Sequence, residues 1–275
     1  YKSLMAQRLH YILTILIIST YCLANGMERI INGTPVDKTD SFYWSTIRII
    51  EKNSDSLWVP SCTGIIYSRN IVLTAGHCLE GKKIDNLRIA YDAQPFSVEQ
   101  QYLQSTWIDP LVVFKTGRIY AFEIHPGYNS TLKKEYDIAV IRAELFHPDR
   151  YRSYPMLTPE IAKKVLPNKS YSFSILGYGL LAANPPAESE ILRKARVLGF
   201  VRDSYILVDQ RFGSGGCFGD SGGPAFLTVD NKSYVAGIAH GGLGSSPNCD
   251  QTGSWIYVPN ILTYVMSAIS RLNSK

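Results

Sequence analysis

The sequence predicts an all-β protein that ends in a single helix. Short apolar or alternating segments recur along most of the chain, and residues typical of turns separate them, which favours β-barrels or sandwiches. Near the end, the pattern changes to a helical period. The apolar residues that would share one helix face are Ile261, Leu262, Val265, Met266, Ile269 and Leu272. Asn260 precedes them and is expected to cap the N-terminus of the helix.

The predicted strands form two sets. The first set comprises residues 61–67, 70–75, 87–91, 119–124 and 137–142, and the second comprises 171–176, 195–201, 204–208, 224–229, 233–239 and 254–258. Residues 143–170 are rich in Pro, Tyr and Lys and are expected to connect the two sets. A chain of 275 residues, 45% of them hydrophobic, is long enough for one large domain or two small ones.

The N-terminal segment is typical of a secretory signal peptide. Its apolar stretch, residues 11–18, is shorter than the roughly 20 residues that cross a bilayer. Basic residues precede this stretch, and Cys22-Leu23-Ala24 follows it with the small residues of a cleavage site. We therefore expect residues 1–24 to be removed and the mature protein to be secreted, either outside the cell or into a periplasm. Retention of the segment as a membrane anchor is the alternative.

Charge and cysteine content agree with export. The net charge of +5 falls to +3 without the two basic residues of the signal peptide, and this excess is too small to indicate a nucleic-acid partner. Four cysteines remain after signal removal, namely Cys62, Cys78, Cys217 and Cys249. An even number of cysteines in an exported chain favours disulfides. A zinc site is disfavoured because no CxxC spacing is present.

The segment Gly219-Asp220-Ser221-Gly222-Gly223-Pro224 is typical of a nucleophilic serine. A serine hydroxyl needs a base to take its proton and N–H groups to receive the charge that develops on the substrate. Glycines around the serine allow a tight turn that exposes backbone N–H groups. On its own, the segment would fit an ordinary surface turn equally well.

Two further segments supply a base and an acid. Thr74-Ala75-Gly76-His77-Cys78 places a histidine after an apolar strand, and Asp137 begins another strand. The GxSxG spacing around Ser221 also fits the nucleophile elbow of α/β-hydrolases, in which the acid and then the histidine follow the serine. Only His240 follows Ser221, and the short interval leaves little room for an acid-bearing strand. The α/β-hydrolase class is therefore disfavoured.

With these motifs, the chain from about residue 30 to residue 275 resembles the trypsin/chymotrypsin family of serine endopeptidases. The resemblance implies two packed six-stranded antiparallel β-barrels that meet at an active-site cleft. Barrel one would span about residues 30–145, barrel two about 146–258, and the C-terminal helix about 260–272.

The resemblance also implies a role for each motif residue. Ser221 would be the nucleophile, His77 the general base and acid, and Asp137 the group that orients the histidine. The N–H groups of Gly219 and Ser221 would hold the oxyanion. Nothing in this mechanism requires a cofactor or a metal ion, and we expect neither.

A zymogen is implied as well. Residues 25–29 would form a short activation propeptide, and cleavage after Arg29 by another protease would free the amine of Ile30. Asp220, a carboxylate beside the nucleophile, would receive this amine and lock the oxyanion loop.

The family pairing of cysteines implies the disulfides Cys62–Cys78 and Cys217–Cys249. The first would tie the His77 turn to its neighbouring strand, and the second would brace the substrate pocket beside the nucleophile.

The pocket that receives the substrate side chain before the cut would be lined by Gly215, Gly216, Gly242 and Gly253. Gly215 at its floor carries no charge, and glycine walls leave space, so we expect a preference for bulky apolar side chains. Asp250, in an enlarged loop, is the alternative source of a negative charge that would favour Arg and Lys.

His240 departs from the family pattern, which usually has a Ser-Trp-Gly segment here whose serine supports the catalytic aspartate. The simpler interpretation is that His240 points to solvent or fills space. The alternative is that it forms a hydrogen bond near Asp137.

Two functional classes follow. The first is an active secreted endopeptidase, monomeric, that acts on protein or peptide substrates and meets an activating protease and protein inhibitors. The second is a catalytically weak homologue that acts as a binding or regulatory protein. The presence of all three triad residues favours the first.

Overall fold

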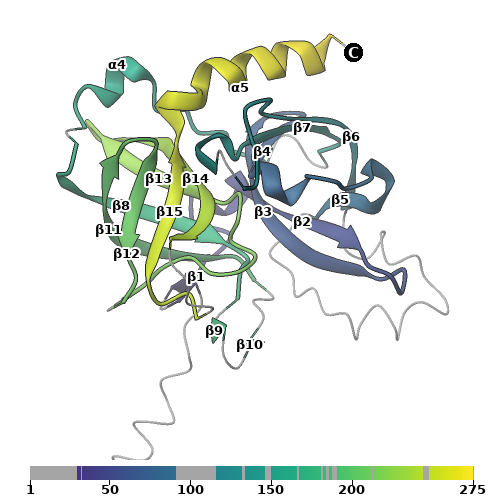
Figure 1. Cartoon of the computed structure of the whole chain (residues 1–275), viewed down its shortest axis with the longest axis horizontal. Coiled ribbons are helices and arrows are strands. Elements are labelled where there is room, and N and C mark those ends of the chain that lie inside the picture. Colours follow the sequence, from purple (N-terminus) through teal and green to yellow (C-terminus); the bar gives the residue numbers. More distant parts are fainter. Residues whose placement is uncertain are drawn as a thin grey trace, which may run out of the picture.

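The computed structural model describes residues 30–31, 33–90, 116–131, 134–145, 150–165, 167–180, 182–183, 186–187, 191–211, 213–243 and 248–274. The predicted signal peptide and the predicted cleavage site at Arg29 lie outside this part of the chain, as does most of the loop before Cys249. Within the described residues, no helix has both the length and the apolar content needed to cross a bilayer. The fold consists of two antiparallel β-barrels and one long C-terminal helix (Figure 1).

The first barrel is closed by six strands in the order β2-β3-β4-β7-β6-β5. Their bounds are β2 Thr46–Lys52, β3 Trp58–Ser68, β4 Ile71–Thr74, β5 Leu87–Ala90, β6 Thr116–Ile124 and β7 Ala139–Ala143. Strand β2 was not among the predicted strands. It pairs with both β3 and β5, so it closes the ring. Fully buried Ile and Leu side chains, Ile49 and Leu87 among them, fill the interior of this barrel.

The second barrel forms a ring of six strands in the order β8-β11-β12-β15-β14-β13. Their bounds are β8 Ser170–Gly177, β11 Arg193–Arg202, β12 Tyr205–Asp209, β13 Pro224–Val229, β14 Lys232–Leu243 and β15 Thr252–Tyr257. The short β1 (Thr34–Pro35) adds to β11 at the edge of this barrel, and β9 (Ala182–Ala183) pairs with β10 (Pro186–Ala187). The predicted fold class, all-β with two six-stranded barrels and a C-terminal helix, is therefore confirmed.

Two α-helices and four short 3-10 helices complete the described chain. Helix α4 (Pro159–Ala162) is a single turn that Thr158 caps, because its hydroxyl accepts the N–H of Ile161. Helix α5 spans Val258–Asn273. The prediction that Asn260 caps α5 is wrong, because the helix begins two residues earlier. Pro259 fits the first turn of the helix. N–H groups in this turn have no acceptor within the helix, so the N–H that proline lacks is not missed.

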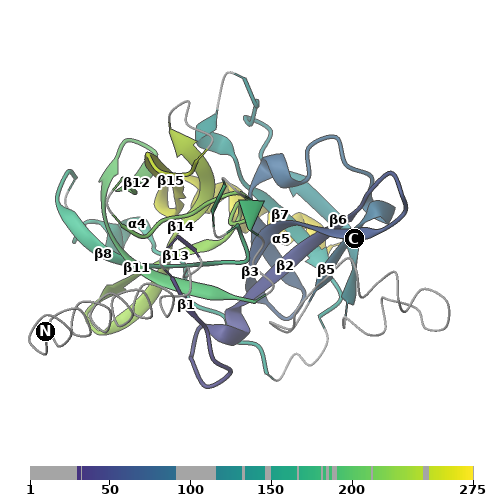
Figure 2. The same cartoon turned by 90° about the horizontal axis from the view of Figure 1, so that it is seen from below.

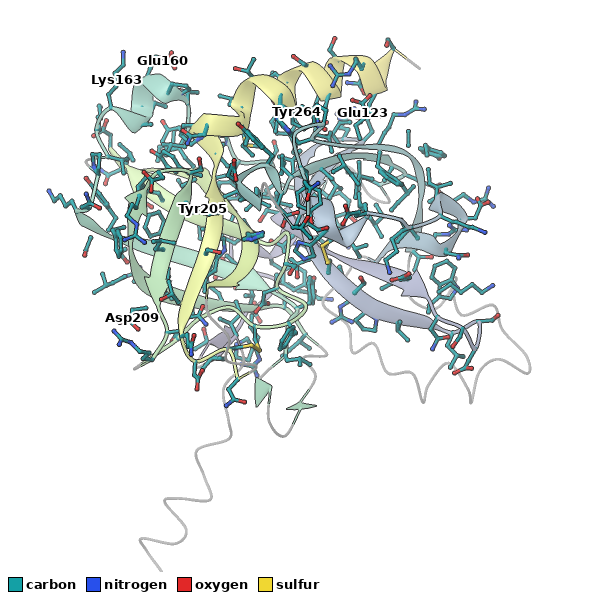
Figure 3. The ribbon with its side chains drawn as sticks, viewed as in Figure 1. Glu123, Glu160, Lys163, Tyr205, Asp209 and Tyr264 are labelled. Carbon is teal, nitrogen blue, oxygen red and sulfur yellow. A yellow bond between two sulfur atoms is a disulfide. The ribbon has the colours of Figure 1, made fainter. Side chains whose placement is uncertain are left out.

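Helix α5 leaves the second barrel and lies across the first (Figures 1 and 2). The hydroxyl of Tyr264 donates to the carbonyl oxygen of Glu123 on β6 at 3.0 Å, and Arg271 bonds the Glu123 carboxylate at 2.8 Å (Figure 3). The largest apolar cluster joins Val265 of α5 to Leu73 of the first barrel and Phe226 of the second. This shared core fixes the two barrels against each other.

Candidate active site

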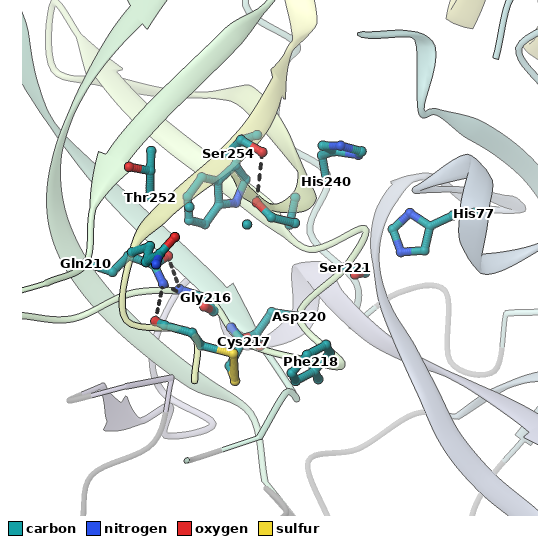
Figure 4. Close-up of a pocket in the computed structure, with 17 residues that line it drawn as sticks. His77, Gln210, Gly216, Cys217, Phe218, Asp220, Ser221, His240, Thr252 and Ser254 are labelled. Atoms are coloured by element: carbon teal, nitrogen blue, oxygen red, sulfur yellow. Dashed lines mark hydrogen bonds between the residues drawn. A yellow bond between two sulfur atoms is a disulfide. The ribbon is translucent and has the colours of Figure 1, made fainter. Parts of the chain in front are cut away.

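A pocket of about 450 Å³ opens where the two barrels meet (Figure 4). His77 comes from the first barrel, and the other lining residues come from the second. They are Gln210, Gly216, Cys217, Phe218, Asp220, Ser221, Ala239, His240, Gly241, Gly242, Cys249, Gln251, Thr252, Gly253, Ser254 and Trp255. The pocket therefore contains the predicted nucleophile, the predicted base and most of the predicted pocket glycines.

Asp137 lies fully buried just before β7 and receives three hydrogen bonds. Its Oδ1 accepts the backbone N–H of His77 at 2.8 Å, and its Oδ2 accepts Nδ1 of His77 at 2.6 Å and Nδ1 of His240 at 2.5 Å. An ionised carboxylate can only accept, so both imidazoles carry a hydrogen on Nδ1. Burial raises the pKa of Asp137, but the hydrogen bonds from His240 and His77 outweigh it and hold the pKa at about 2.

His77 is positioned by the turn Gly76–Cys78 that follows β4. Gly76 lets this turn approach the carboxylate, since a Cβ atom there would lie 3.1 Å from Oδ1 of Asp137. The disulfide between Cys78 and Cys62 of β3 anchors the turn to its neighbouring strand. With Nδ1 bonded to Asp137, the other ring nitrogen of His77 carries a lone pair that can take a proton.

The turn that carries Ser221 packs directly on the first barrel. The N–H of Thr63 donates to the carbonyl oxygen of Ser221 at 2.9 Å, and the Thr63 hydroxyl donates to that of Gly219 at 2.8 Å. Gly222 has a φ of +83°, and a Cβ atom there would lie 2.1 Å from Oγ1 of Thr74. Only glycine fits this position, because both the backbone conformation and the close approach exclude a side chain.

The backbone around Ser221 also offers N–H donors. Among the described residues, the N–H groups of Gly219 and Ser221 have no protein acceptor, whereas those of Gly222 and Gly223 are bonded to Ala239 and Asp220. Gly219 has a φ of +92°. This arrangement leaves two donors beside the serine for a negatively charged oxygen.

Asp220 is a buried carboxyl next to the serine. Burial raises its pKa to about 7, although the N–H groups of Cys217 and Gly179 each donate to it at 2.8 Å. Ile30 is also buried, in the core of the second barrel, and its neighbour Ile31 pairs with Gly215. The start of the predicted mature chain therefore lies beside the segment that leads into Asp220.

His240 does not point to solvent, so the simpler interpretation of this residue is wrong. Its side chain is 12% exposed, and its Nδ1 bonds Oδ2 of Asp137, at the place where the family pattern has a serine. The reason is the need of the buried carboxylate for hydrogen-bond donors, because Nδ1 of His240 supplies one of the donors to Asp137.

The space beside two of the predicted pocket glycines is not empty. The side chain of Gln210 lies against Gly215 and Gly253, so the predicted open floor at Gly215 is filled by a residue from another segment. Asp250 is exposed and does not line the pocket. The disulfide Cys217–Cys249 is present and joins the two segments that flank this floor. Gln210 belongs to no motif, and nothing in the sequence marks it.

Metal binding is not needed to explain the cluster of His77, Asp137 and His240. These residues have the donor types that zinc prefers, and their ligand atoms lie within 4.8 Å of one another. The same atoms are already joined by hydrogen bonds of 2.5 and 2.6 Å, which account for the arrangement. The second such cluster includes Cys62 and Cys78, whose sulfur atoms form a disulfide.

Two barrels meet at a pocket lined by a serine and a histidine, and the histidine bonds a buried aspartate, an arrangement typical of serine proteases. The family model named Trypsin matches residues 30–269, and the chain belongs to the trypsin family of serine endopeptidases.

Known members of the family cover most of the chain. Chymotrypsin-like elastase family member 1 of Canis lupus familiaris is 26% identical over 271 residues, which cover 93% of this chain and 95% of that protein. Brachyurin of Leptuca pugilator is 30% identical over 206 residues, which cover 69% of this chain and 78% of that protein.

Proposed function

We propose that this protein is a secreted endopeptidase that cleaves peptide bonds through Ser221, His77 and Asp137. The observation that carries the proposal is the 2.6 Å hydrogen bond from Nδ1 of His77 to the buried Asp137. His77 and Ser221 line the same pocket (Figure 4). The donor on one ring nitrogen leaves the other free to act as a base.

The chemistry follows from these contacts. His77 takes the hydroxyl proton of Ser221 while the oxygen attacks the scissile carbonyl carbon. The N–H groups of Gly219 and Ser221 bond the oxyanion. His77 then gives the proton to the leaving amine, and an acyl-enzyme remains. Water then attacks the acyl-enzyme ester with His77 again as the base. This step releases the acid product and regenerates the Ser221 hydroxyl. Asp137 stays ionised throughout, because its low pKa favours the charged form.

Activation by a cut after Arg29 is part of the proposal. The buried Asp220 has two backbone donors and no described cation, and its raised pKa reflects an unfavourable charged state. A new ammonium at Ile30 would stabilise that charge. The partners are protein or peptide substrates, an activating protease and protein inhibitors, and the active form is a monomer that requires no cofactor.

The substrate pocket favours a bulky apolar side chain before the cut. Gly216 and Gly242 line its walls, and a Cβ atom at Gly242 would meet only one atom within 4 Å. A second pocket of about 190 Å³ lies beyond Phe218, which is 59% exposed and borders both pockets. This second pocket extends the cleft past the nucleophile and would accommodate the leaving side of a peptide.

Active-site labelling tests the proposal. Protein cut after Arg29 should react with an organophosphonate at Ser221, and Ser221→Ala should abolish the label. Ser221→Ala and His77→Ala should each lower kcat by about 10⁴-fold or more, and Asp137→Asn should be nearly as severe because it stabilises the wrong tautomer. Ser270→Ala, an exposed serine on α5, is the matched control and should keep full activity.

Failure of the processed protein to label or to cleave any peptide would favour the alternative, a binding or regulatory homologue. Near-wild-type turnover in any of the three triad variants would contradict the assigned roles. Equal activity in the uncut chain would contradict the zymogen.

A further inference from the structure

The floor of the main pocket is built by Gln210, which follows β12. Its backbone N–H donates to the carbonyl oxygen of Gln251 at 2.7 Å. This hydrogen bond fixes the position of the Gln210 backbone, from which the side chain enters the pocket. Only 5% of the residue is exposed, and its side chain lines the pocket (Figure 4). A buried glutamine in a substrate pocket is uncommon unless its amide is fully bonded.

The amide of Gln210 meets this condition. Nε2 donates to the carbonyl oxygen of Gly216 at 3.0 Å and to that of Cys249 at 2.7 Å, and Oε1 accepts the N–H of Gly216 at 3.0 Å. Both amide hydrogens are used, so the nitrogen end has no donor left for a substrate. The amide therefore bridges the same two segments that the disulfide Cys217–Cys249 joins.

The glycines of the floor are the counterpart of this side chain. A Cβ atom at Gly215 would lie 2.2 Å from Cδ of Gln210, and one at Gly253 would lie 2.0 Å from its Oε1. Such approaches are far shorter than any van der Waals contact. A side chain at Gly215 or Gly253 would clash with Gln210 in its observed position. Gln210 therefore occupies the space that a side chain at the floor would otherwise fill.

The neighbouring carboxyl groups do not charge the floor. Asp209 pairs with Arg211 at 2.6 Å, and Asp250 is exposed and outside the pocket lining. The carboxyl of Asp220 borders the pocket, but its oxygens accept the backbone N–H groups of Gly179 and Cys217, and in the proposed active form the amine of Ile30 offsets its charge. The described floor therefore presents a neutral amide.

We propose that Gln210 determines the specificity of this pocket: it closes the floor with a neutral, donor-saturated amide and so selects substrates with an uncharged side chain over Lys or Arg. This inference rests on the proposed function, since the pocket receives a substrate side chain only if Ser221 is the nucleophile beside it. A cation at this floor meets no opposite charge, and the two carbonyl oxygens nearest to it each already accept a hydrogen bond from Gln210, so its desolvation is poorly compensated.

Two substitutions separate the volume of the Gln210 side chain from its hydrogen bonds as the cause of specificity. Gln210→Ala opens the floor and frees the carbonyl oxygens of Gly216 and Cys249, which can then accept hydrogen bonds from an ammonium group. Gln210→Met is the matched control, because it keeps the length and the neutrality of the side chain. If Gln210→Ala does not fold, Gln210→Ser provides the same test with a hydroxyl that bonds one of the two carbonyl oxygens.

The assay compares two peptides that differ only in Phe or Lys before the cut, with kcat/KM expressed per site titrated by an organophosphonate. The processed wild type should prefer Phe by about 100-fold. The preference should fall by about tenfold or more in Gln210→Ala and stay within about threefold of wild type in Gln210→Met. A wild type that prefers Lys, or an unchanged preference in Gln210→Ala, overturns the role of Gln210.

Equilibrium binding distinguishes failure of this inference from failure of the proposed function. Processed Ser221→Ala protein should bind the Phe peptide more tightly than the Lys peptide, and the added Gln210→Ala change should reduce the difference. If this pattern holds while no peptide is cleaved by the wild type, the proposed function fails and the role of Gln210 stands. Equal binding of both peptides by Ser221→Ala protein overturns it.

Discussion

Replacement of His240 should weaken catalysis although this residue is absent from the triad. His240 supplies one of three hydrogen bonds to Asp137, and it shares Oδ2 with His77. A hydrogen bond to a charged, fully buried group contributes roughly 1.5–3 kcal/mol. If the orientation of His77 depends on it, His240→Ala should lower kcat/KM by about 10- to 100-fold, the lower part of the range that this energy allows.

The stability of His240→Ala should change with pH in a defined direction. The pKa of Asp137 is lowered from 3.8 to about 2, so its ionised form stabilises the fold above pH 4, and this contribution is lost as pH falls through the folded pKa. The shift corresponds to about 2 kcal/mol. Without His240, the pKa should rise toward its ordinary value, and acid unfolding should begin at a higher pH.

The assay pairs His240→Ala with His240→Ser. Both remove the ring, but serine provides a hydroxyl donor, the group that the family pattern has at this position. The measurements are kcat/KM per titrated active site between pH 5 and 9 and the midpoint of acid unfolding. Partial recovery in His240→Ser supports the hydrogen bond. An alanine variant with unchanged kcat/KM and an unchanged acid midpoint would refute the reasoning.

Two further predictions concern Asp220 and the disulfide Cys62–Cys78. Since burial raises the pKa of Asp220 to about 7, the uncut chain should lose up to about 4 kcal/mol of its free energy of unfolding as pH rises from 4 to 7. Urea denaturation at several pH values measures this loss, and Asp220→Asn should remove it. The same pH dependence in both chains would contradict the prediction. Replacement of Cys62 and Cys78 by Ser opens a loop with a sequence separation of 16 and should lower the free energy of unfolding by about 3 kcal/mol. An unchanged midpoint of urea denaturation would show that this disulfide does not stabilise the fold.

Features set by neighbours in sequence were predictable. Most of the strands, though not β2, and the turn that carries Ser221 follow from local pattern, because side-chain alternation and glycine conformations are properties of short segments. The cap of α5 was predicted wrongly because the helix begins two residues before Asn260, which therefore lies inside its first turn. The Asn260 side chain instead donates from Nδ2 to the carbonyl oxygen of Asp203.

Features set by distant segments were not predictable. Gln210 and Gly253 are separated by more than 40 residues, and the pairing of β12 with β15 brings them together. Likewise, the hydrogen bond of His240 to Asp137 crosses from one barrel to the other, so the sequence offered two interpretations and no means to choose. A pattern within one segment carries no information about such pairs.

The position of α5 has a consequence for biosynthesis. The helix is formed by Val258–Asn273, at the far end of the chain, yet it holds the first barrel through Glu123 and through the shared apolar cluster. During synthesis, the first barrel emerges before this helix, so it can fold early, whereas the clamp between the barrels cannot form until α5 has emerged. His77 and Ser221 lie on opposite sides of that joint. A nascent chain in which α5 has not yet formed therefore lacks this clamp between the barrel that carries His77 and the barrel that carries Ser221.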